Sequence, residues 1–348
     1  MRFVIGFAAP LSTPQAMVGE PMLRTVEMAV ADARARGLDV EVRAVDDQEN
    51  EQVAARVAAE LAADPSVIAV IGHKNSGPSR AAAPVYAAAG LTQVTQCSTN
   101  NALSRAGWPT FFRLCADNER QASVAAEFAY KRDPSARVVA VHDGTDYGRP
   151  LVQAFAARLQ ALSGRAVPLL AMHVGQEDFT EIVESIRGAA PAIVDFGATE
   201  IESSKLMKAL HAAGVKALVM SSEGGPDNPL ARLAGPAGEG SIHTYAGADP
   251  LATPASRRLV DRCRAEFGET PSYVVECYDA VTVIVTALER GATTRKAVRD
   301  AIAATDLEGV GGRIRFDAAG DRIDAPVSLW QVMGGRMVPL AERPLPTA

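Results

Sequence analysis

Four short polar segments carry side chains that could bind a small charged molecule. They are HKNSG at 73–77, QCSTN at 96–100, GTDYG at 144–148 and SSEG at 221–224. Each follows an apolar run typical of a β-strand, and the first leads into a helical pattern. A helix start offers N–H groups to a carboxylate, whereas Glu223 could bind an ammonium group. Taken one by one, such residues also serve in loops and helix caps, but together they predict two halves of one zwitterion site.

The sequence lacks the motifs of the common enzyme classes. It contains no GxSxG elbow, HExxH, CxxC or P-loop. The glycine-rich Gly309–Gly312 precedes an expected strand instead of a helix, so we expect a turn there. The five histidines are scattered, and the four cysteines have no metal-ligand spacing. We therefore expect no catalytic residues, no metal and no cofactor; a hydrolase stays an alternative that would need a nucleophile–base pair.

Length and composition are those of an ordinary two-domain globular protein. The chain has 348 residues, of which 48% are hydrophobic, 22% charged and only 5% aromatic. The net charge is −6 and no basic block occurs, which argues against nucleic-acid or anionic-membrane binding. No apolar run approaches the ~20 residues of a membrane span. Arg2–Ala8 is expected to form the first strand, and no signal-peptide pattern precedes it.

Strand and helix patterns alternate through the first two thirds of the chain. Strands are expected at 3–8, 40–45, 67–71 and 91–95, and again at 137–142, 166–173, 192–196 and 216–220. Helical spacing of apolar residues separates them, around 22–33, 53–61, 79–89, 119–131, 149–162, 179–187 and 201–213. Such alternation with short connections predicts two parallel sheets, each covered by helices on both faces.

The last hundred residues depart from this alternation. Three helices are expected at 255–267, 273–290 and 295–303. They are followed by a predicted hairpin of strands 313–316 and 327–333, joined through 317–324. These elements do not easily make a third domain, so we assign them to the first two lobes.

The chain would then cross between the lobes more than once, and we predict three crossings. The crossings are expected near 117–118, 245–248 and 324–325. Lobe 1 comprises 1–117 plus 249–324, and lobe 2 comprises 118–248 plus 325–348. In open α/β sheets, ligands bind beyond the carboxyl ends of the strands, so the ligand cleft is expected between the lobes.

Short motifs along nearly the whole chain resemble the type I solute-binding proteins of ABC transporters, in the branch that binds leucine, isoleucine and valine. The motifs are GFAAPLS, VDDQEN, VIGHKNSGPS, FFRLCADNERQ, VHDGTDYG, LHAAGV, SSEG and FDAAGDR. Each is short, and the resemblance depends on their order and spacing. It implies an α/β fold of two doubly wound, Rossmann-like lobes joined by a three-strand hinge, which closes on the ligand.

The resemblance also implies roles for residues of the first lobe. Ser76 occupies the position of a serine whose hydroxyl binds the ligand carboxylate. Thr99 matches a threonine that uses both its hydroxyl and its N–H group. Cys97 falls where backbone groups contact the ligand, and Ser98 beside it belongs to the same expected binding loop.

In the second lobe, the resemblance implies that Tyr147 closes over the ligand and that Glu223 pairs with the α-ammonium group. The chain also departs from the family pattern, because Val18 and Thr199 stand where aromatic residues are often found. Asn75 lies near a position of the family's first-lobe disulfide, which is not matched. The side-chain pocket is thus expected to be wider or more polar, and its candidate lining residues are Lys74, Asn75, Gln96 and Glu200.

The resulting functional prediction is a binding protein and not an enzyme. We expect the substrate-binding component of an ABC importer, taking a small α-amino acid of the branched-chain or aliphatic type. The expected partner is a membrane permease, and the protein is expected to be a monomer. The expected location is the periplasm, after removal of a signal peptide, with a lipid anchor as a variant. The alternative is the same fold binding an amide, an aromatic acid or another small carboxylate; whether Cys263 pairs with Cys277 stays open.

Overall fold

The computed structural model describes residues 2–340. The chain divides into two compact units, each assembled from two stretches of sequence. Unit 1 comprises Met1–Ala116 and Gly247–Pro326, and unit 2 comprises Asp117–Ala246 and Val327–Ala348. These boundaries lie one or two residues from those of the predicted lobes.

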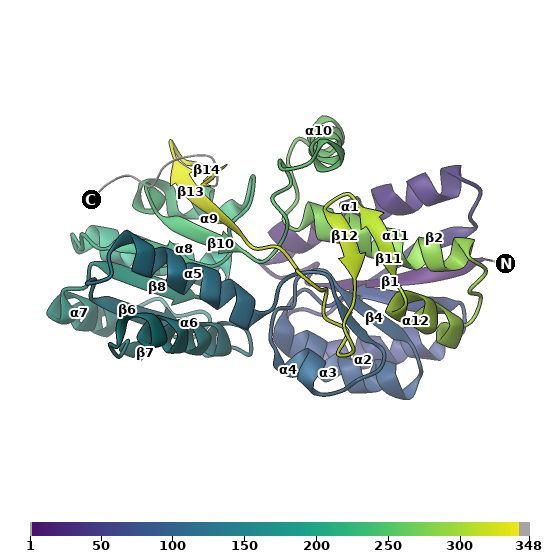
Figure 1. Ribbon diagram of the computed structural model, residues 1–348, viewed down its shortest axis with the longest axis horizontal. Helices are drawn as coiled ribbons and strands as arrows, with labels where there is room; N and C mark the ends of the chain where they lie inside the picture. The colour runs from purple at the N-terminus through teal and green to yellow at the C-terminus, as the bar shows by residue number, and fades with distance from the viewer. Residues whose placement is uncertain (1, 341–348) are drawn as a thin grey trace. The chain divides into compact units, whose positions relative to one another are not determined.

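Unit 1 is a parallel sheet covered by helices. Its strands are β1 (Phe3–Ala9), β2 (Val40–Asp46), β3 (Val67–Gly72), β4 (Thr92–Thr95) and β5 (Phe111–Arg113), in the order β2-β1-β3-β4-β5. The first stretch adds α1 (Ala16–Ala35), α2 (Glu51–Ala63), α3 (Ser76–Ala88) and α4 (Ala102–Arg105). The second adds α10 (Pro254–Phe267), α11 (Val274–Glu289), α12 (Arg295–Ala303) and the hairpin of β11 (Asp306–Gly309) and β12 (Gly312–Arg315). Helices α2 and α3 lie on one side of the sheet, with α1 and α11 on the other (Figure 1).

Burial explains why these segments form a two-sided sheet. All six residues of β3 are buried, as expected for a parallel strand covered on both faces. On one face Val70 packs with Leu61 of α2 and Tyr86 of α3. Helix α11 is apolar on most of its circumference and is buried at twelve positions, so it belongs to the interior of unit 1.

Unit 2 contains a larger, mixed sheet. Its parallel strands are β6 (Val138–His142), β7 (Leu169–Ala171), β8 (Ile193–Gly197), β9 (Leu218–Ser221) and β10 (Ile242–Tyr245). Antiparallel β13 (Ser328–Met333) and β14 (Arg336–Pro339) complete the order β14-β13-β10-β9-β8-β6-β7. The helices are α5 (Asn118–Arg132), α6 (Gly148–Ser163), α7 (Thr180–Ala189), α8 (Glu200–Ala212) and α9 (Pro229–Ala234), followed by a 3₁₀ turn at Gly235–Gly238.

The predicted hairpin of 313–316 with 327–333 is wrong. Strand β12 pairs with β11, and β13 pairs with β10 and β14 instead. The partner β11 reads DLEG, without apolar alternation, so its pairing left no signal in the sequence. The expected strand at 166–173 shortens to Leu169–Ala171, and it lies at the edge of the sheet. The expected turn within Gly309–Gly312 is confirmed, because it joins β11 to β12.

Two further expectations concern the cysteines and the helices. All four cysteines are buried free thiols, so Cys263 and Cys277 do not form a disulfide. Within residues 2–340, no helix combines the length and apolar character needed to cross a bilayer.

Three of the buried carboxyl groups of the described chain have clearly raised pKa values inside the units. On α11, Glu276 Oε1 accepts the Ala248 N–H at 2.9 Å, and Asp279 Oδ1 accepts the Val310 N–H at 2.8 Å. Burial raises the pKa of Glu276 to about 7 and that of Asp279 to about 6. Asp195, on the interior strand β8, is also buried, and burial raises its pKa to about 8. Asp279 explains Gly309, since a Cβ there would lie 2.6 Å from its carboxylate oxygens, whereas a Cβ on Gly311 would lie 2.4 Å from Val275 Cγ1.

Asp195 makes the stability of the protein depend on pH. Its pKa is about 8 in the folded chain but near 4 when unfolded, so only the folded state binds its proton at pH 7. The free energy of unfolding therefore falls as pH rises, by about 1–2 kcal/mol from pH 7 to 8.5, with a smaller share from Glu276. Urea denaturation at both pH values should show this decrease, and Asp195→Asn should remove most of it. An equal decrease in that variant would contradict the assignment.

Candidate functional site

Two of the predicted binding segments meet at one edge of the unit 1 sheet. Strands β3 and β4 are hydrogen-bonded neighbours, with Ile71 opposite Val94. Because parallel strands end at the same edge, the loops at 73–77 and 96–100 leave the sheet side by side. The structure thus brings Asn75, Ser76 and the 97–99 segment together within one unit.

Buried hydroxyl groups tie these two loops to each other. Ser98 Oγ donates to the carbonyl oxygen of His73 at 2.8 Å and lies 2.7 Å from Ser79 Oγ. Thr95 Oγ1 also donates to the His73 oxygen, at 3.1 Å, and accepts the Ser98 N–H at 3.0 Å. The Ser98 hydroxyl is therefore engaged within the loops and ties the segment after β4 to the segment after β3.

Ser76 and Thr99 present groups suited to a carboxylate. Ser76 is the first residue of α3, and its Oγ accepts the Asn100 N–H at 3.4 Å. The cap residue Asn75 makes no side-chain cap bond to this helix, which leaves the first N–H groups of α3 available. Among the described residues, the buried Thr99 Oγ1 and Asn75 Oδ1 have no hydrogen-bond partner. Unpaired buried polar atoms are costly, so these atoms mark a place where a ligand could bind.

The remaining unit 1 candidates occupy supporting positions. The Cys97 thiol donates to the Lys74 carbonyl at 3.3 Å, so its side chain is directed toward the loop after β3. Lys74 is buried, and its Nζ donates to Gln15 Oε1 at 3.0 Å. Val18 is buried in the first turn of α1, three residues after Gln15. Gln15 was missed by the sequence analysis, because nothing in its local pattern indicates contact with Lys74.

In unit 2, Tyr147 lies against Glu223. Tyr147 follows β6, while Ser222 and Glu223 follow β9, and the tyrosine hydroxyl shares side-chain hydrogen bonds with both. Burial, reinforced by the negative charge of Glu223, raises the pKa of Tyr147 well above its usual value, so the phenol is neutral. Glu223 itself is buried and has a positive φ of 68°. A carboxylate held beside a neutral hydroxyl can accept a hydrogen bond from an ammonium group.

The Tyr147 loop is built on a tight turn. Thr145 Oγ1 donates to Asp143 Oδ1 at 2.6 Å and accepts the N–H of Gly148 at 3.0 Å. Burial raises the pKa of Asp143 above its usual value. Gly148 touches the end of β8, because a Cβ there would lie 2.1 Å from the Gly197 carbonyl oxygen. Only glycine allows this close approach, which sets where Tyr147 leaves the sheet.

Thr199 lies at the cap position of α8, in the loop after β8. Its hydroxyl donates to Glu202 Oε2 at 2.6 Å, three residues along the helix. Its neighbour Glu200 is fully buried, and the charge of Glu200 acts on Tyr147. Thr199 therefore lies on the same sheet edge as Tyr147 and Glu223, with its hydroxyl engaged in the helix start.

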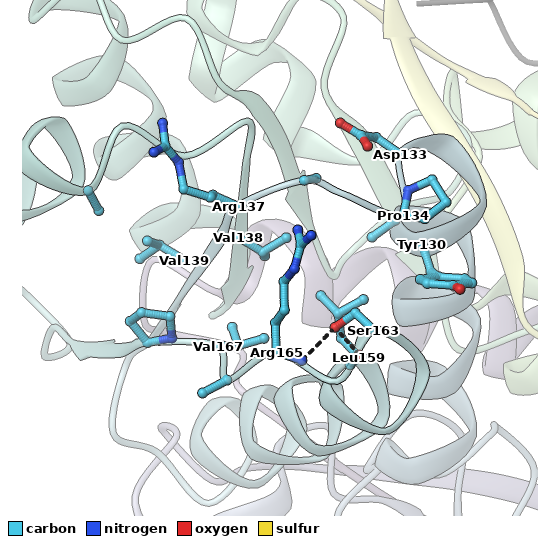
Figure 2. A pocket seen from close by; sticks show the side chains of 15 residues that line it. Tyr130, Asp133, Pro134, Arg137, Val138, Val139, Leu159, Ser163, Arg165 and Val167 are labelled. Atoms are coloured by element: carbon cyan, nitrogen blue, oxygen red, sulfur yellow. Dashed lines mark hydrogen bonds between the residues drawn. The ribbon is translucent and has the colours of Figure 1, made fainter.

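A separate pocket of about 230 Å³ lies at the other edge of the unit 2 sheet. Figure 2 shows Arg137 and Arg165 beside apolar side chains such as Val138 and Val167. Val138 begins β6, so this pocket is at the amino ends of the strands, away from Tyr147. None of the predicted binding residues lines it. Among residues 2–340, no cluster of His, Cys, Asp and Glu has an arrangement that could hold a metal ion.

Comparison with known proteins gives a consistent result. Residues 3–336 match the model of a family described as periplasmic binding protein. Leu/Ile/Val-binding protein homolog 2 of Brucella abortus is 30% identical over 335 residues, which is 94% of this chain and 90% of that protein. The crystal structure of leucine binding protein LivK from Thermotoga maritima has a TM-score of 0.89 and 25% identity, covering 97% of both chains. A solute binding protein of an ABC transporter from R. palustris, in complex with benzoate, has a TM-score of 0.85 and 21% identity, covering 98% of this chain and 96% of that one.

Gly148→Ala should destabilise the protein, because the added methyl group overlaps the Gly197 carbonyl oxygen. We expect a loss of about 1–3 kcal/mol in the free energy of unfolding, measured by urea denaturation. Gly188→Ala is the matched control, since Gly188 lies in α7 with no atom within 4 Å of its added Cβ. That change should be neutral or stabilise by up to about 1 kcal/mol. Equal effects of the two substitutions would refute the close-approach argument.

Proposed function

This chain belongs to the family of periplasmic binding proteins, and on that premise we propose that it is the substrate-binding component of an ABC importer. The proposed ligand is a small α-amino acid of the branched-chain or aliphatic type. The resemblance described from the sequence is confirmed by the family match over residues 3–336 and by the 30% identity to a Leu/Ile/Val-binding protein homolog. The predicted α/β fold is confirmed by the two doubly wound units and by the likeness to LivK. Membership of a solute-binding family supports a binding function over catalysis.

The observation that carries this proposal is the pair of opposite chemistries in the two units. Unit 1 offers a helix start, the Ser76 hydroxyl and the Thr99 hydroxyl, which has no partner within residues 2–340, and all of these suit a carboxylate. Unit 2 offers Glu223 beside Tyr147, which suits an ammonium group. An α-amino acid carries one group of each kind, so we propose that the ligand carboxylate binds unit 1 and its ammonium group binds unit 2.

The ligand side chain would be recognised by residues other than those that bind its carboxylate and ammonium groups. Val18 and Thr199 are proposed to contribute there, with Asn75 and the backbone at Cys97. Val18 is apolar and buried, and the Thr199 hydroxyl is engaged with Glu202. Both therefore offer mainly apolar surface to a ligand, which supports an aliphatic side chain.

The proposed partner and location follow from the family. We propose that the protein acts as a single chain outside the cytoplasm, in the periplasm, and delivers its ligand to a membrane permease. In a variant of this proposal, a lipid anchor attaches the protein to the membrane.

A second candidate function is the binding of a small carboxylate without an amine. It is favoured by the relative of similar fold whose structure contains benzoate. Glu223 distinguishes the two functions, because its buried carboxylate can bind the ammonium group of an amino acid but has no such group to bind on a simple carboxylate ligand.

Glu223→Gln should separate these functions. We expect the unmutated protein, stripped of carried-over ligand by unfolding and refolding, to bind leucine in isothermal titration calorimetry. In Glu223→Gln we expect roughly 100-fold weaker binding, about 3 kcal/mol, since the ammonium group loses its charged acceptor.

The control is Glu184→Gln on the exposed side of α7, which should bind leucine normally. Unchanged leucine affinity in Glu223→Gln would refute the assigned role of Glu223. Binding of benzoate but not of any amino acid by the unmutated protein would establish the second candidate function instead.

A further inference from the structure

Arg113, the last residue of β5, is completely buried and uses every donor of its guanidinium group. Its Nε and Nη2 donate to Asp321 Oδ1 at 2.9 and 2.6 Å, and Nη2 also donates to Ser104 Oγ at 3.0 Å. Its Nη1 donates to the carbonyl oxygens of Ser98 at 3.3 Å and Asn100 at 2.9 Å. A guanidinium group has five N–H donors, and these five contacts account for all of them.

The two carbonyl groups held by Arg113 Nη1 stand on either side of Thr99. One nitrogen atom therefore holds the carbonyl groups of the residues before and after Thr99, whose hydroxyl is buried without a partner among the described residues. The Asn100 N–H donates in turn to Ser76 Oγ at 3.4 Å. Arg113 is thus connected to both hydroxyl groups that suit a carboxylate, although it contacts neither of them.

A segment far along the chain supplies the charge that balances Arg113. The turn at 317–321 is closed by Asp317, whose Oδ1 accepts the Asp321 N–H at 2.9 Å. Its backbone joins the end of β5, because the Arg113 N–H donates to the Gly320 oxygen at 2.8 Å. Gly320 has a φ of 85°, and a Cβ there would lie 2.1 Å from the Phe111 oxygen. Only glycine permits this contact, which places Asp321 against Arg113.

We infer that Arg113, neutralised by Asp321, is a positioning residue that orients Thr99 for the ligand carboxylate. The inference rests on the proposed function for the identity of the ligand, but the contacts that carry it lie entirely within unit 1. A buried cation without its partner carboxylate would draw the neighbouring carbonyl groups toward it or admit water. Either response would move the peptide groups of Ser98 and Asn100, and with them the Thr99 hydroxyl.

Asp321→Asn tests this inference without altering a ligand-contacting residue. We expect at least tenfold weaker leucine binding by calorimetry. Asp306→Asn is the matched control, because Asp306 makes a similar two-bond contact with Arg313 on the surface of the same unit. That variant should bind leucine as the unmutated protein does, and an equal loss in both variants would overturn the inference.

A double-mutant cycle separates positioning from a merely structural role. Thr99→Val should weaken binding in the unmutated background but have a much smaller effect in the Asp321→Asn background, because the hydroxyl is already misplaced. If Thr99→Val weakens leucine binding by the same factor in both backgrounds, the inference is overturned. Should Asp321→Asn fail to fold, Ser104→Ala decides instead, since it removes one of the four acceptor atoms of Arg113. A loss of about threefold or more is then expected, and unchanged affinity would overturn the inference.

A measurement on the ligand-free protein distinguishes failure of this inference from failure of the proposed function. The amide resonances of Ser98, Thr99 and Asn100 should shift in Asp321→Asn and stay in place in Asp306→Asn. Unchanged resonances in Asp321→Asn would overturn the inference even if leucine binds. Shifted resonances in a protein that binds no amino acid would support the positioning role and refute the proposed function.

Discussion

The parallel pairing of β3 with β4 is the constraint on which the unit 1 half of the candidate site depends. Because both strands run in the same direction, their carboxyl ends share one edge and the two following loops must leave it together. The loop carbonyl groups at this edge need donors, and hydroxyl groups of the second loop supply them, with Ser98 donating to His73. The hydrogen bonds that satisfy the carbonyl groups of the first loop thereby also fix the position of the second loop.

In unit 2, a close contact between backbone segments fixes the positions of the loops. The contact between Gly148 and Gly197 brings the loops after β6 and β8 closer than any side chain would allow. The phenol of Tyr147 then stands beside Glu223, which comes from the loop after β9. In both units, the residues proposed to bind the ligand are thus held by neighbours that take no part in binding.

Buried ionisable groups have different kinds of partner at different places in the fold. Asp279 is held by two backbone N–H groups of a glycine-rich turn, and Arg113 is matched by Asp321 and makes three further hydrogen bonds. Burial without such a partner is the sole cause of the raised pKa of Asp195. The difference follows from geometry, because a turn or a loop can bend to meet a charge whereas a central strand is committed to its ladder.

The alternation of the longer strands and helices and the family could be predicted from the sequence, which also supplied the residues now proposed to bind the ligand. Continuous apolar runs such as Val67–Ile71 report burial on both faces directly, and polar residues after them mark the edge where ligands bind. The short strands β5 and β11 gave no comparable signal. Strand β5 has only three residues, and β11, the partner of β12, is polar.

What only the tertiary structure decided was which hydroxyl groups are engaged inside the loops and which are left for the proposed ligand. Ser98 and Thr99 are adjacent and similar in chemistry, yet one hydroxyl is bonded inside the loops and the other is unpartnered among the described residues. Arg113 and Asp321 are 208 residues apart, so no local pattern connects them. Composition and periodicity determine which segments are buried, but a hydrogen bond depends on distances of a few ångströms between segments that meet only when the chain is folded.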